Sequence, residues 1–348
     1  MKRQSIVEYG SPLAETLAET PKPTGTEVLI RVHHCGVCHS DIHLQDGHFN
    51  LGNDKKLDVT SGRELPFTLG HEIEGEVVEL GPDAHDVSIG QRRIVYPWIG
   101  CNTCAVCQSG QEHLCKKTYH LGLNVDGGFS DYVLVPHPRY LLDYSGISPE
   151  LAGPYMCSGL TAYSALKKAG PLLKGEALMI MGLGGVGMMA LQFAKSMFDG
   201  PVFACDIDAE KRAQGRKAGA LECFDPSDKD ARRNFYKMTG GARAAVDFVG
   251  AESSLDFAQG CLAKGGRVIV AGLIGGEFKI PIPMFPLRAI SIIGTFVGSL
   301  DEAKEMISLV QSGTVSPIPI ETRPLDQASA TLDDLRAGKI TGRVVLQP

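Results

Sequence analysis

With 348 residues, the chain is too long for one ordinary hydrophobic core, so its length predicts two domains. Hydrophobic residues make up 43% of it and charged residues 21%, and no segment approaches the ~18 apolar residues of a membrane span. The formal net charge of −6, without a run of Lys or Arg, argues against nucleic acid and membrane surfaces as partners and favours a small-molecule ligand. No secretory signal follows the N-terminus, and we expect a cytoplasmic protein whose ten cysteines serve metal or redox chemistry.

The N-terminal part of the chain carries short segments in which apolar and polar residues alternate, as in half-buried strands. They are EVLIRVHHC (27–35), EGEVVEL (74–80), RRIVYPW (92–98) and SDYVLVP (130–136). These segments predict a mostly β domain. Residues 49–65, FNLGNDKKLDVTSGREL, show no clear period, and we expect a surface loop there.

Residues 36–43, GVCHSDIH, gather a thiol, two imidazoles, a hydroxyl and a carboxylate. Such a cluster is compatible with a set of metal ligands, with a nucleophile and its base, or with a polar loop that has no role. The segment alone leaves these three alternatives open.

Four cysteines with short spacers come next, namely Cys101, Cys104, Cys107 and Cys115. The short spacers let the chain wrap one tetrahedral ion, because thiolates must converge on Zn²⁺ at about 2.3 Å. The alternative is a set of buried or disulfide-paired cysteines, which a reducing compartment disfavours. Since four protein ligands leave no position for a substrate, the motif predicts a closed, structural zinc site.

From about residue 150, apolar strands alternate with helical segments. The strand ALMIMG (177–182) leads into a G-x-G-x-x-G motif, and a helical period follows. The residues of the motif that we expect at the cofactor are Gly182, Gly184, Gly185, Val186 and Gly187. Glycines at this junction allow a tight turn and let a pyrophosphate approach the positive end of the helix.

Asp206 ends a second apolar strand, PVFACDID (201–208), and follows Gly187 by 19 positions. A dinucleotide fold places there the acid that accepts hydrogen bonds from the adenosine ribose, and its charge would repel a 2′-phosphate. The motif therefore predicts NAD rather than NADP. The alternative for Asp206 is a helix-capping or solvated role, and Asp208 is the other candidate acid.

Strands and helices continue to alternate through LECFD, a helix near 228–238, AAVDFVG, a helix near 253–262 and GRVIVAGL. Alternating strands and helices of these lengths predict an α/β fold with a doubly wound parallel sheet. We expect the last strand of this sheet near 290–294. A helix around 301–312, a second helix and the strand GRVVLQP close the chain. This tail is too small to be a domain, so we expect it to return to the first one.

Six motifs, in their order along the chain, resemble those of the zinc-dependent medium-chain alcohol dehydrogenases. They are GVCHSDIH, LGHEIEGEVVELG, the four-cysteine segment, MCSGLTAY, GLGGVG with its trailing Asp, and ITGRVV. The resemblance implies a GroES-like catalytic domain of residues 1–152 and 295–348 and a Rossmann domain of residues 153–294. It also implies NAD-dependent oxidation of an alcohol to an aldehyde or ketone, the reverse reaction, and two Zn²⁺ per chain, one catalytic and one structural.

The catalytic Zn²⁺ of the family is held by residues that correspond to Cys38, His71 and Cys157. Cys35 forms a C-x2-C pattern with Cys38, but the family's ligand is the residue before H-[ST]-D, so we assign Cys35 to a buried strand. The resemblance further implies that Glu72 lies beside the metal and that Asp41 orients one of its ligands.

Ser40 matches the hydroxyl that hydrogen-bonds the substrate oxygen. His43 matches the imidazole at the far end of a relay through the nicotinamide ribose, where an ordinary imidazole can release a proton around neutral pH. A solvated surface side chain is the alternative for His43, and His39 faces either the cofactor phosphates or solvent. On the cofactor side, the resemblance implies roles for Lys211 at the ribose, Arg343 at the pyrophosphate and Thr161 at the nicotinamide, with surface or helix positions as the alternatives.

Trp98, the only tryptophan, corresponds to an aromatic residue that the family places against the substrate, and a core position is the alternative. Cys38 and His71 are 33 positions apart, roughly ten more than we expect for the family, and the excess falls in the segment 50–65. That segment can cap the substrate cleft, alter a subunit contact or remain solvated.

Two other activities are compatible with parts of this pattern. A polyol or sugar-alcohol dehydrogenase shares the fold, although many of its members use an acid at the position of Cys157. A zinc-stabilised sensor without turnover is the alternative from a different class, and the intact relay and metal ligands argue against it. By analogy with the family we expect a homo-oligomer, with a tetramer favoured over a dimer.

Overall fold

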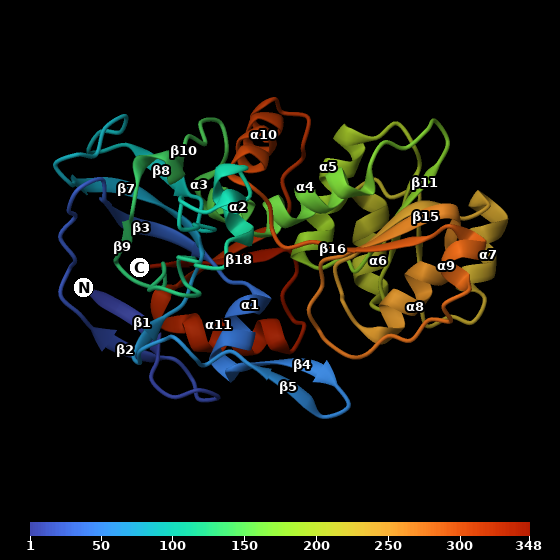
Figure 1. The fold of residues 1–348 in the computed structure, drawn as a ribbon, viewed down its shortest axis with the longest axis horizontal. Coiled ribbons are helices and arrows are strands. Elements are labelled where there is room, and N and C mark those ends of the chain that lie inside the picture. Colours follow the sequence, from blue (N-terminus) through green and yellow to red (C-terminus); the bar gives the residue numbers. More distant parts are fainter.

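The computed structural model describes residues 1–348 and shows two lobes along its long axis (Figure 1). The first lobe contains a small sheet of order β2-β1-β6 and a larger one of order β10-β8-β7-β3-β18-β17, in which β9 also pairs with β3. Their strands are β1 (Lys2–Ile6), β2 (Ala14–Leu17), β3 (Val28–Gly36), β6 (Phe67–Thr68), β7 (Glu72–Leu80), β8 (Arg92–Val95), β9 (Tyr132–Val135), β10 (Leu141–Leu142), β17 (Ile320–Pro324) and β18 (Arg343–Gln347).

The last strand of the chain completes the sheet that the first part of the chain builds. β18 pairs antiparallel with β3, with Leu346 opposite Cys35 and Val345 opposite Gly36. Both ends of the chain therefore lie in the same lobe, on the left of Figure 1. The exact domain boundaries, at residues 152 and 294, stay predictions.

The second lobe is built on six parallel strands in the order β13-β12-β11-β14-β15-β16. They are β11 (Ala177–Met181), β12 (Val202–Cys205), β13 (Glu222–Phe224), β14 (Ala242–Asp247), β15 (Leu262–Val270) and β16 (Ser291–Gly294). This arrangement confirms the predicted doubly wound sheet. The strand order reverses between β11 and β14, and such sheets bind ligands at the carboxyl ends of their strands at that point.

The chain has eleven α-helices, of which those in the second lobe cover the two faces of the parallel sheet (Figure 1). They are α1 (His39–Asp46), α2 (Ala105–Gln108), α3 (Pro149–Ala152), α4 (Ser158–Ala169), α5 (Gly185–Met197), α6 (Ala209–Lys217), α7 (Ala231–Thr239), α8 (Glu252–Gly260), α9 (Met284–Arg288), α10 (Leu300–Gln311) and α11 (Ala328–Arg336). None of them combines the length and the apolar character that a membrane crossing requires.

Strand β11 shows why its sequence is apolar at every position. Successive side chains of a strand point to opposite faces of the sheet. Leu178 and Ile180 join the larger core, which continues through α4 and α5 into the first lobe, whereas Met179 and Met181 join a second core on the other face. A strand buried on both faces needs the continuous apolar run that the sequence has.

The prediction of a surface loop at residues 49–65 is wrong for the first part of this segment. That part forms an antiparallel hairpin of β4 (His48–Gly52) and β5 (Lys55–Asp58). Asn53 and Asp54 make the turn with positive φ angles of 49° and 60°, which these two residue types tolerate. All four residues of β5 are exposed, so the hairpin has no buried face to produce an alternating pattern. In Figure 1 it extends from the first lobe toward the second.

Candidate active site

The three predicted ligands of a catalytic metal, together with Glu72, come together at the junction of the two lobes. One donor atom from each of Cys38, His71, Glu72 and Cys157 lies within 4.8 Å of the others, and all four residues are buried. The Sγ atoms of Cys38 and Cys157 are 3.9 Å apart although 119 positions separate them in the chain.

Three different elements deliver these ligands. Cys38 follows β3 and caps the N-terminus of α1, and Cys157 ends a 3₁₀ turn and caps α4. His71 precedes β7 and follows Gly70, whose φ of +94° and close contacts leave no room for a side chain: a Cβ there would lie 2.5 Å from the ring of Phe129. The left-handed backbone at Gly70 is therefore needed to turn His71 inward.

Asp41 supports two of the ligands from behind. Its Oδ2 accepts a hydrogen bond of 2.8 Å from the backbone N–H of Cys38, and its Oδ1 lies 3.4 Å from Nδ1 of His71. Both ring nitrogens of His71 are buried without a hydrogen bond, so Nδ1 has only the contact with Asp41 and Nε2 is free. A carboxylate behind one imidazole nitrogen and a free second nitrogen are the usual arrangement of a metal-binding histidine.

The electrostatics of the two cysteines also favour a cation. A hydrogen bond from Cys157 holds the pKa of the Cys38 thiol well below its usual range despite burial, and His71 acts in the same direction. The hydrogen bond with Cys38 and burial raise the pKa of Cys157. Without a cation, the Cys38 thiolate is stabilised only while Cys157 stays protonated. A divalent cation stabilises both residues as thiolates. Two thiols and an unpartnered buried imidazole fit Zn²⁺.

Glu72 is held by two partners. Its Oε1 accepts a hydrogen bond of 2.8 Å from Ser158 Oγ, and its Oε2 accepts one from the buried guanidinium of Arg343. Burial raises the pKa of Glu72, and Arg343 opposes this shift. Gly36 makes room for the carboxylate, because a Cβ there would lie 2.0 Å from Oε2. Ser158 and Gly36 were not among the predicted site residues, although both belong to the motifs that flank Cys157 and Cys38.

The two predicted relay residues lie on one face of α1, because residues three apart are neighbours on a helix. Ser40 Oγ is 3.8 Å from the Sγ of Cys38, and half-buried His43 lies one turn further along. Burial, followed by the charge of His39, lowers the pKa of His43. His43 is therefore neutral near neutral pH, as a proton acceptor must be. His39 itself is exposed within electrostatic range of Arg343 and Lys211.

The glycine motif forms the predicted turn between β11 and α5. Gly182 has a φ of +86°, and a Cβ at Gly187 would lie 1.8 Å from the carbonyl oxygen of Gly182. Gly184 caps the 13-residue helix α5 and has open space where its Cβ would be, and Gly185 and Val186 begin the helix. The motif thus leaves the positive end of a helix accessible, which fits a dinucleotide pyrophosphate.

Two of the other predicted cofactor residues, Asp206 and Arg343, contact this motif. Oδ2 of Asp206 accepts a hydrogen bond of 2.8 Å from the N–H of Leu183 inside the motif. Asp208 instead caps α6, accepting from the N–H of Lys211 at 3.0 Å. The stem of Arg343 lies against Gly185, since a Cβ on Gly185 would be 2.4 Å from its Cδ. Thr161 lies half-buried in α4, one turn after Cys157.

Trp98 occupies a core position beside the predicted metal ligands, and its contact with substrate stays a prediction. It is fully buried and donates a hydrogen bond of 2.7 Å to the carbonyl of Met156, and its ring lies 5.4 Å from that of His71. His120 and Phe296 pack on it at 5.4 and 5.5 Å. Neither of these two was predicted, because the loops that carry them have no motif and meet Trp98 only in the folded chain.

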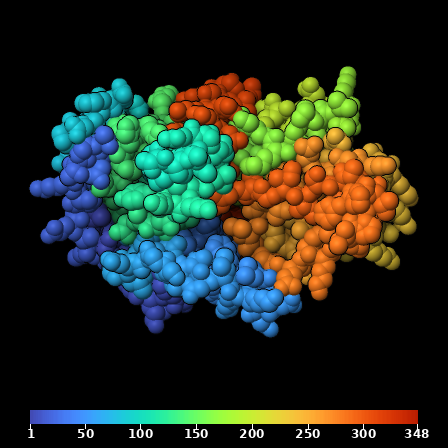
Figure 2. Space-filling view, in the orientation of Figure 1, coloured from blue at the N-terminus to red at the C-terminus, as the bar shows by residue number.

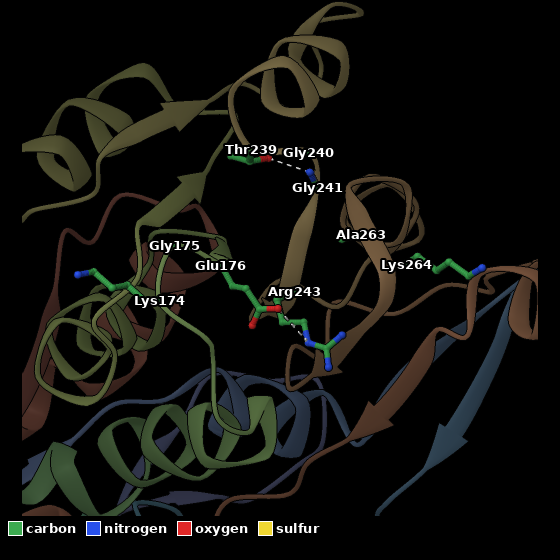
Figure 3. A pocket seen from close by; sticks show the side chains of 9 residues that line it. All are labelled: Lys174, Gly175, Glu176, Thr239, Gly240, Gly241, Arg243, Ala263 and Lys264. Atoms are coloured by element: carbon green, nitrogen blue, oxygen red, sulfur yellow. Dashed lines mark hydrogen bonds and ion pairs between the residues drawn. The ribbon is translucent and has the colours of Figure 1, made fainter.

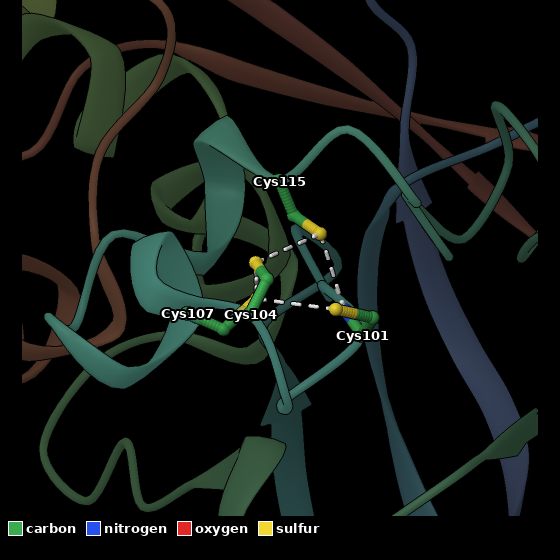
Figure 4. Close-up of side chains that lie close together, drawn as sticks. All are labelled: Cys101, Cys104, Cys107 and Cys115. Carbon is green, nitrogen blue, oxygen red and sulfur yellow. Dashed lines mark hydrogen bonds between the residues drawn. The ribbon is translucent and has the colours of Figure 1, made fainter.

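The four-cysteine segment forms a second, separate cluster (Figure 4). The Sγ atom of Cys107 lies 3.9 Å from that of Cys101 and 3.5 Å from that of Cys104, and 3.8 Å separates Cys104 from Cys115. Four converging thiols fit a closed tetrahedral Zn²⁺ site. Cys35, by contrast, is buried in β3 and belongs to neither cluster, as predicted.

A surface pocket of about 360 Å³ lies at the amino-terminal edge of the parallel sheet, where β11 and β14 begin (Figure 3). Arg243 and Glu176 in its wall pair with each other at 3.7 Å, and Lys174 and Lys264 point in opposite directions. The pocket contains no convergent set of donors, and dinucleotide sheets bind their ligands at the other edge.

Two family models match the chain: the alcohol dehydrogenase GroES-like domain over residues 24–144 and the zinc-binding dehydrogenase over residues 185–312. An NAD-dependent alcohol dehydrogenase of Sulfurisphaera tokodaii is 36% identical over 351 aligned positions, which cover 100% of both chains. The solved alcohol dehydrogenase of Aeropyrum pernix is 31% identical with a TM-score of 0.90, and the D-arabinose dehydrogenase of Sulfolobus solfataricus is 27% identical with a TM-score of 0.85, each over 100% of both chains.

These comparisons confirm the predicted pairing of a GroES-like domain with a Rossmann-type sheet and NAD as the cofactor. Together with the two donor clusters, they are consistent with two zinc ions per chain.

Proposed function

The chain belongs to the zinc-containing medium-chain alcohol dehydrogenases and is an NAD-dependent alcohol dehydrogenase, and from this premise we propose how its own residues carry out the oxidation. The observation that carries the proposal is the convergence of two thiols, an unpartnered imidazole and the Ser40 hydroxyl at one buried point. When bound, Zn²⁺ polarises the substrate oxygen and NAD⁺ accepts the hydride.

Three residues hold the metal in this proposal, namely Cys38, His71 and Cys157. Asp41 keeps the ring of His71 in place through Nδ1, so that Nε2 faces the metal. Glu72 stays paired with Arg343 and Ser158 and supplies negative charge beside the site without being a permanent ligand.

The proton of the substrate hydroxyl leaves along α1. Ser40 Oγ accepts it and passes it toward His43, which is neutral near neutral pH because burial lowers its pKa. His43 is half-buried at the outer side of the helix and can release the proton to solvent. Both residues act only as carriers, so the hydroxyl of Ser40 is regenerated in each turnover.

The cofactor lies on the glycine motif, Gly182, Gly184, Gly185, Val186 and Gly187. Asp206 and Lys211 bind the adenosine ribose, Arg343 binds the pyrophosphate, and Thr161 contacts the nicotinamide. The hydrogen bond between Asp206 and the motif supports this placement, because it holds the carboxylate beside the pyrophosphate turn. Replacing Asp206 with Gly should relax the preference for NAD over NADP, measured as the ratio of kcat/KM values. An unchanged ratio would transfer the role to Asp208.

The substrate is an alcohol whose carbon chain packs on Trp98. A polyol or sugar alcohol is the second candidate, and the likeness to a D-arabinose dehydrogenase supports it. NADH formation should be followed with linear, branched, cyclic, aromatic and polyhydroxylated alcohols. Turnover of simple alcohols at the highest kcat/KM supports the first candidate, and no NADH from any of them would refute the function.

We also propose that the protein is a cytoplasmic homo-oligomer in which two copies pair along β16. This strand is at the edge of the sheet, with β15 as its only neighbour, and exposed apolar side chains such as Ile282 and Leu287 lie nearby in the chain. The unpaired N–H and C=O groups of an apolar edge strand can pair with the same strand of a second copy. The molar mass from light scattering should be that of a dimer or a tetramer, with a tetramer favoured. The variant Ile292→Lys should shift this mass toward that of the monomer.

A further inference from the structure

The β4–β5 hairpin begins at the end of the helix that carries the proton relay. Helix α1 ends at Asp46 and is capped by Gly47, which has the left-handed conformation with a φ of 76°, and β4 starts at His48. Phe49, the second residue of β4, places its ring 4.5 Å from that of His43 at an angle of 32°. The base of the hairpin therefore forms one wall around the outer relay residue.

The far end of the hairpin touches the cofactor-binding lobe. A Cβ on Gly52 would lie 2.9 Å from backbone atoms of Gly276 and Glu277, and a Cβ on Gly275 would lie 2.2 Å from the carbonyl oxygen of Asn50. Lys55 and Glu277 add an ion pair of 3.3 Å. In Figure 2 the blue hairpin meets the orange surface of the second lobe at the lower edge of the molecule.

The loop that receives the hairpin, residues 272–277, follows β15 and is tied to the glycine motif. The N–H of Gly275 donates to the carbonyl of Gly250 at 2.9 Å, and that of Ile274 donates to Val249 at 3.2 Å. Val249 in turn packs on the motif, since a Cβ on Gly182 would lie 2.7 Å from its Cγ2. Packed groups thus run without a break from the pyrophosphate turn to His43.

We propose that the hairpin is a clamp through which cofactor binding at the glycine motif positions His43, with Phe49 as the positioning residue. An isolated two-stranded hairpin is marginal in water, and β5 buries none of its residues, so the hairpin depends on its two contacts for a defined position. The ion pair at its tip is exposed and contributes little, which leaves the glycine-to-backbone packing as the main contact. The proposal rests on the relay role of His43.

Adjacency alone does not establish coupling, so the coupling itself has to be measured. Hydrogen exchange of residues 48–58 in the zinc-loaded full chain should slow about tenfold when NAD⁺ is added, as local opening becomes less frequent. Gly275→Ala should abolish this protection, because its methyl group collides with Asn50. Gly276→Ala is the matched control, since it also has a positive φ, of 120°, but its Cβ would meet nothing closer than 3.6 Å. Equal protection in both variants, or none in the wild type, would refute the clamp.

The second measurement addresses Phe49 through the pH profile of alcohol oxidation. The pKa of His43 is influenced by burial first and then by His39, Asp46, Cys38 and His48. The ring of Phe49 contributes to this burial through its contact with His43. Removing the ring in Phe49→Ala should raise the pKa of His43, and the acidic limb of kcat should move to higher pH, because His43 accepts a proton only when neutral.

At pH 7 we expect kcat of Phe49→Ala to fall while KM for the alcohol changes little. The loss should be smaller than the roughly 100-fold that removal of a whole general base costs at the low end, because His43 itself is still present. Phe49→Tyr should restore both the rate and the position of the acidic limb. Leu51→Ala, at an exposed residue of the same strand, should match the wild type. An unmoved limb, or no rescue by Tyr, refutes the positioning role. If the wild type oxidises no alcohol, the proposed function has failed, whereas the exchange experiment still decides the clamp by NAD⁺ binding alone.

Discussion

The two cysteine clusters of this protein differ in how their donors are brought together. Cys101, Cys104, Cys107 and Cys115 lie in one short segment, and three of them are only half-buried. Cys38, His71 and Cys157 come from three elements and are all buried, with polar groups beside them that are not metal ligands. A segment can close around its own ion, whereas a site that must admit a substrate is assembled where two lobes meet.

The surroundings of the clusters differ in the same sense. Glu112, in the four-cysteine segment, accepts hydrogen bonds from Arg139 at 2.9 Å and from Tyr140 at 2.7 Å, which tie the segment to the first lobe. None of these three side chains forms a hydrogen bond with a thiol of the cluster. At the other cluster, Asp41 and Ser40 face the ligands directly. The first set of contacts attaches the segment to its lobe, and the second set surrounds the predicted metal ligands.

Removing one ligand from the buried cluster should have the largest effect. We expect Cys157→Ala to lower kcat/KM for alcohol oxidation about 1000-fold, because loss of metal assistance costs several kcal/mol and about 1.4 kcal/mol corresponds to a factor of ten. Metal analysis should find two zinc ions per chain in the wild type and one in the variant. Cys35→Ala is the control: this thiol is equally buried, lies next to the site and should be dispensable for both ions. Full alcohol oxidation by Cys157→Ala would remove Cys157 from the ligand set.

Removing one ligand from the closed cluster should change stability rather than chemistry. We expect Cys104→Ser to lose the other zinc ion and to lower Tm by roughly 5 °C, while the rate per folded active site stays within about twofold of the wild type. Thr103→Ala is the control, because its hydroxyl touches Cys101 Sγ at 3.5 Å without being a ligand. A loss of activity without a change in Tm would contradict a purely structural role.

The difference between the clusters also explains what the sequence could predict. The spacing of the four cysteines is local information and was sufficient, as was the glycine motif, whose turn depends on neighbouring residues only. Ligands such as His71 and Cys157 could be assigned only through the resemblance, because no spacing rule connects them. Gly36 and Ser158 depend on where Glu72 lies after folding, so their roles were invisible.

The hairpin was missed for a different reason. Strands are recognised by a buried face, and β5 has none. Its turn, Asn53-Asp54, lacks the glycine that makes a hairpin turn conspicuous in a sequence. The contacts of His120 and Phe296 with Trp98 could not be predicted, because residues in loops show no hydrophobic periodicity that indicates their partners.

Among the variants that weaken zinc binding, the smallest loss is expected for Asp41→Asn, which tests whether the surroundings of a cluster matter as well as its ligands. Asp41→Asn keeps an oxygen for the N–H of Cys38, so α1 should retain its cap, but it removes the negative charge 3.4 Å from His71. Zinc affinity of the buried cluster should fall about 10- to 100-fold, the usual cost of losing the partner of a metal-binding histidine. The four-cysteine cluster contains no histidine and should keep its ion.

Zinc release to a chelator, followed over time, separates the two ions. Asp46→Asn, on the same helix but paired with Arg336, controls for a general loss of charge and should release zinc as the wild type does. If both ions left Asp41→Asn at the rates seen for the wild type, the ligands alone would determine zinc affinity, and the contrast between the two clusters would reduce to ligand type.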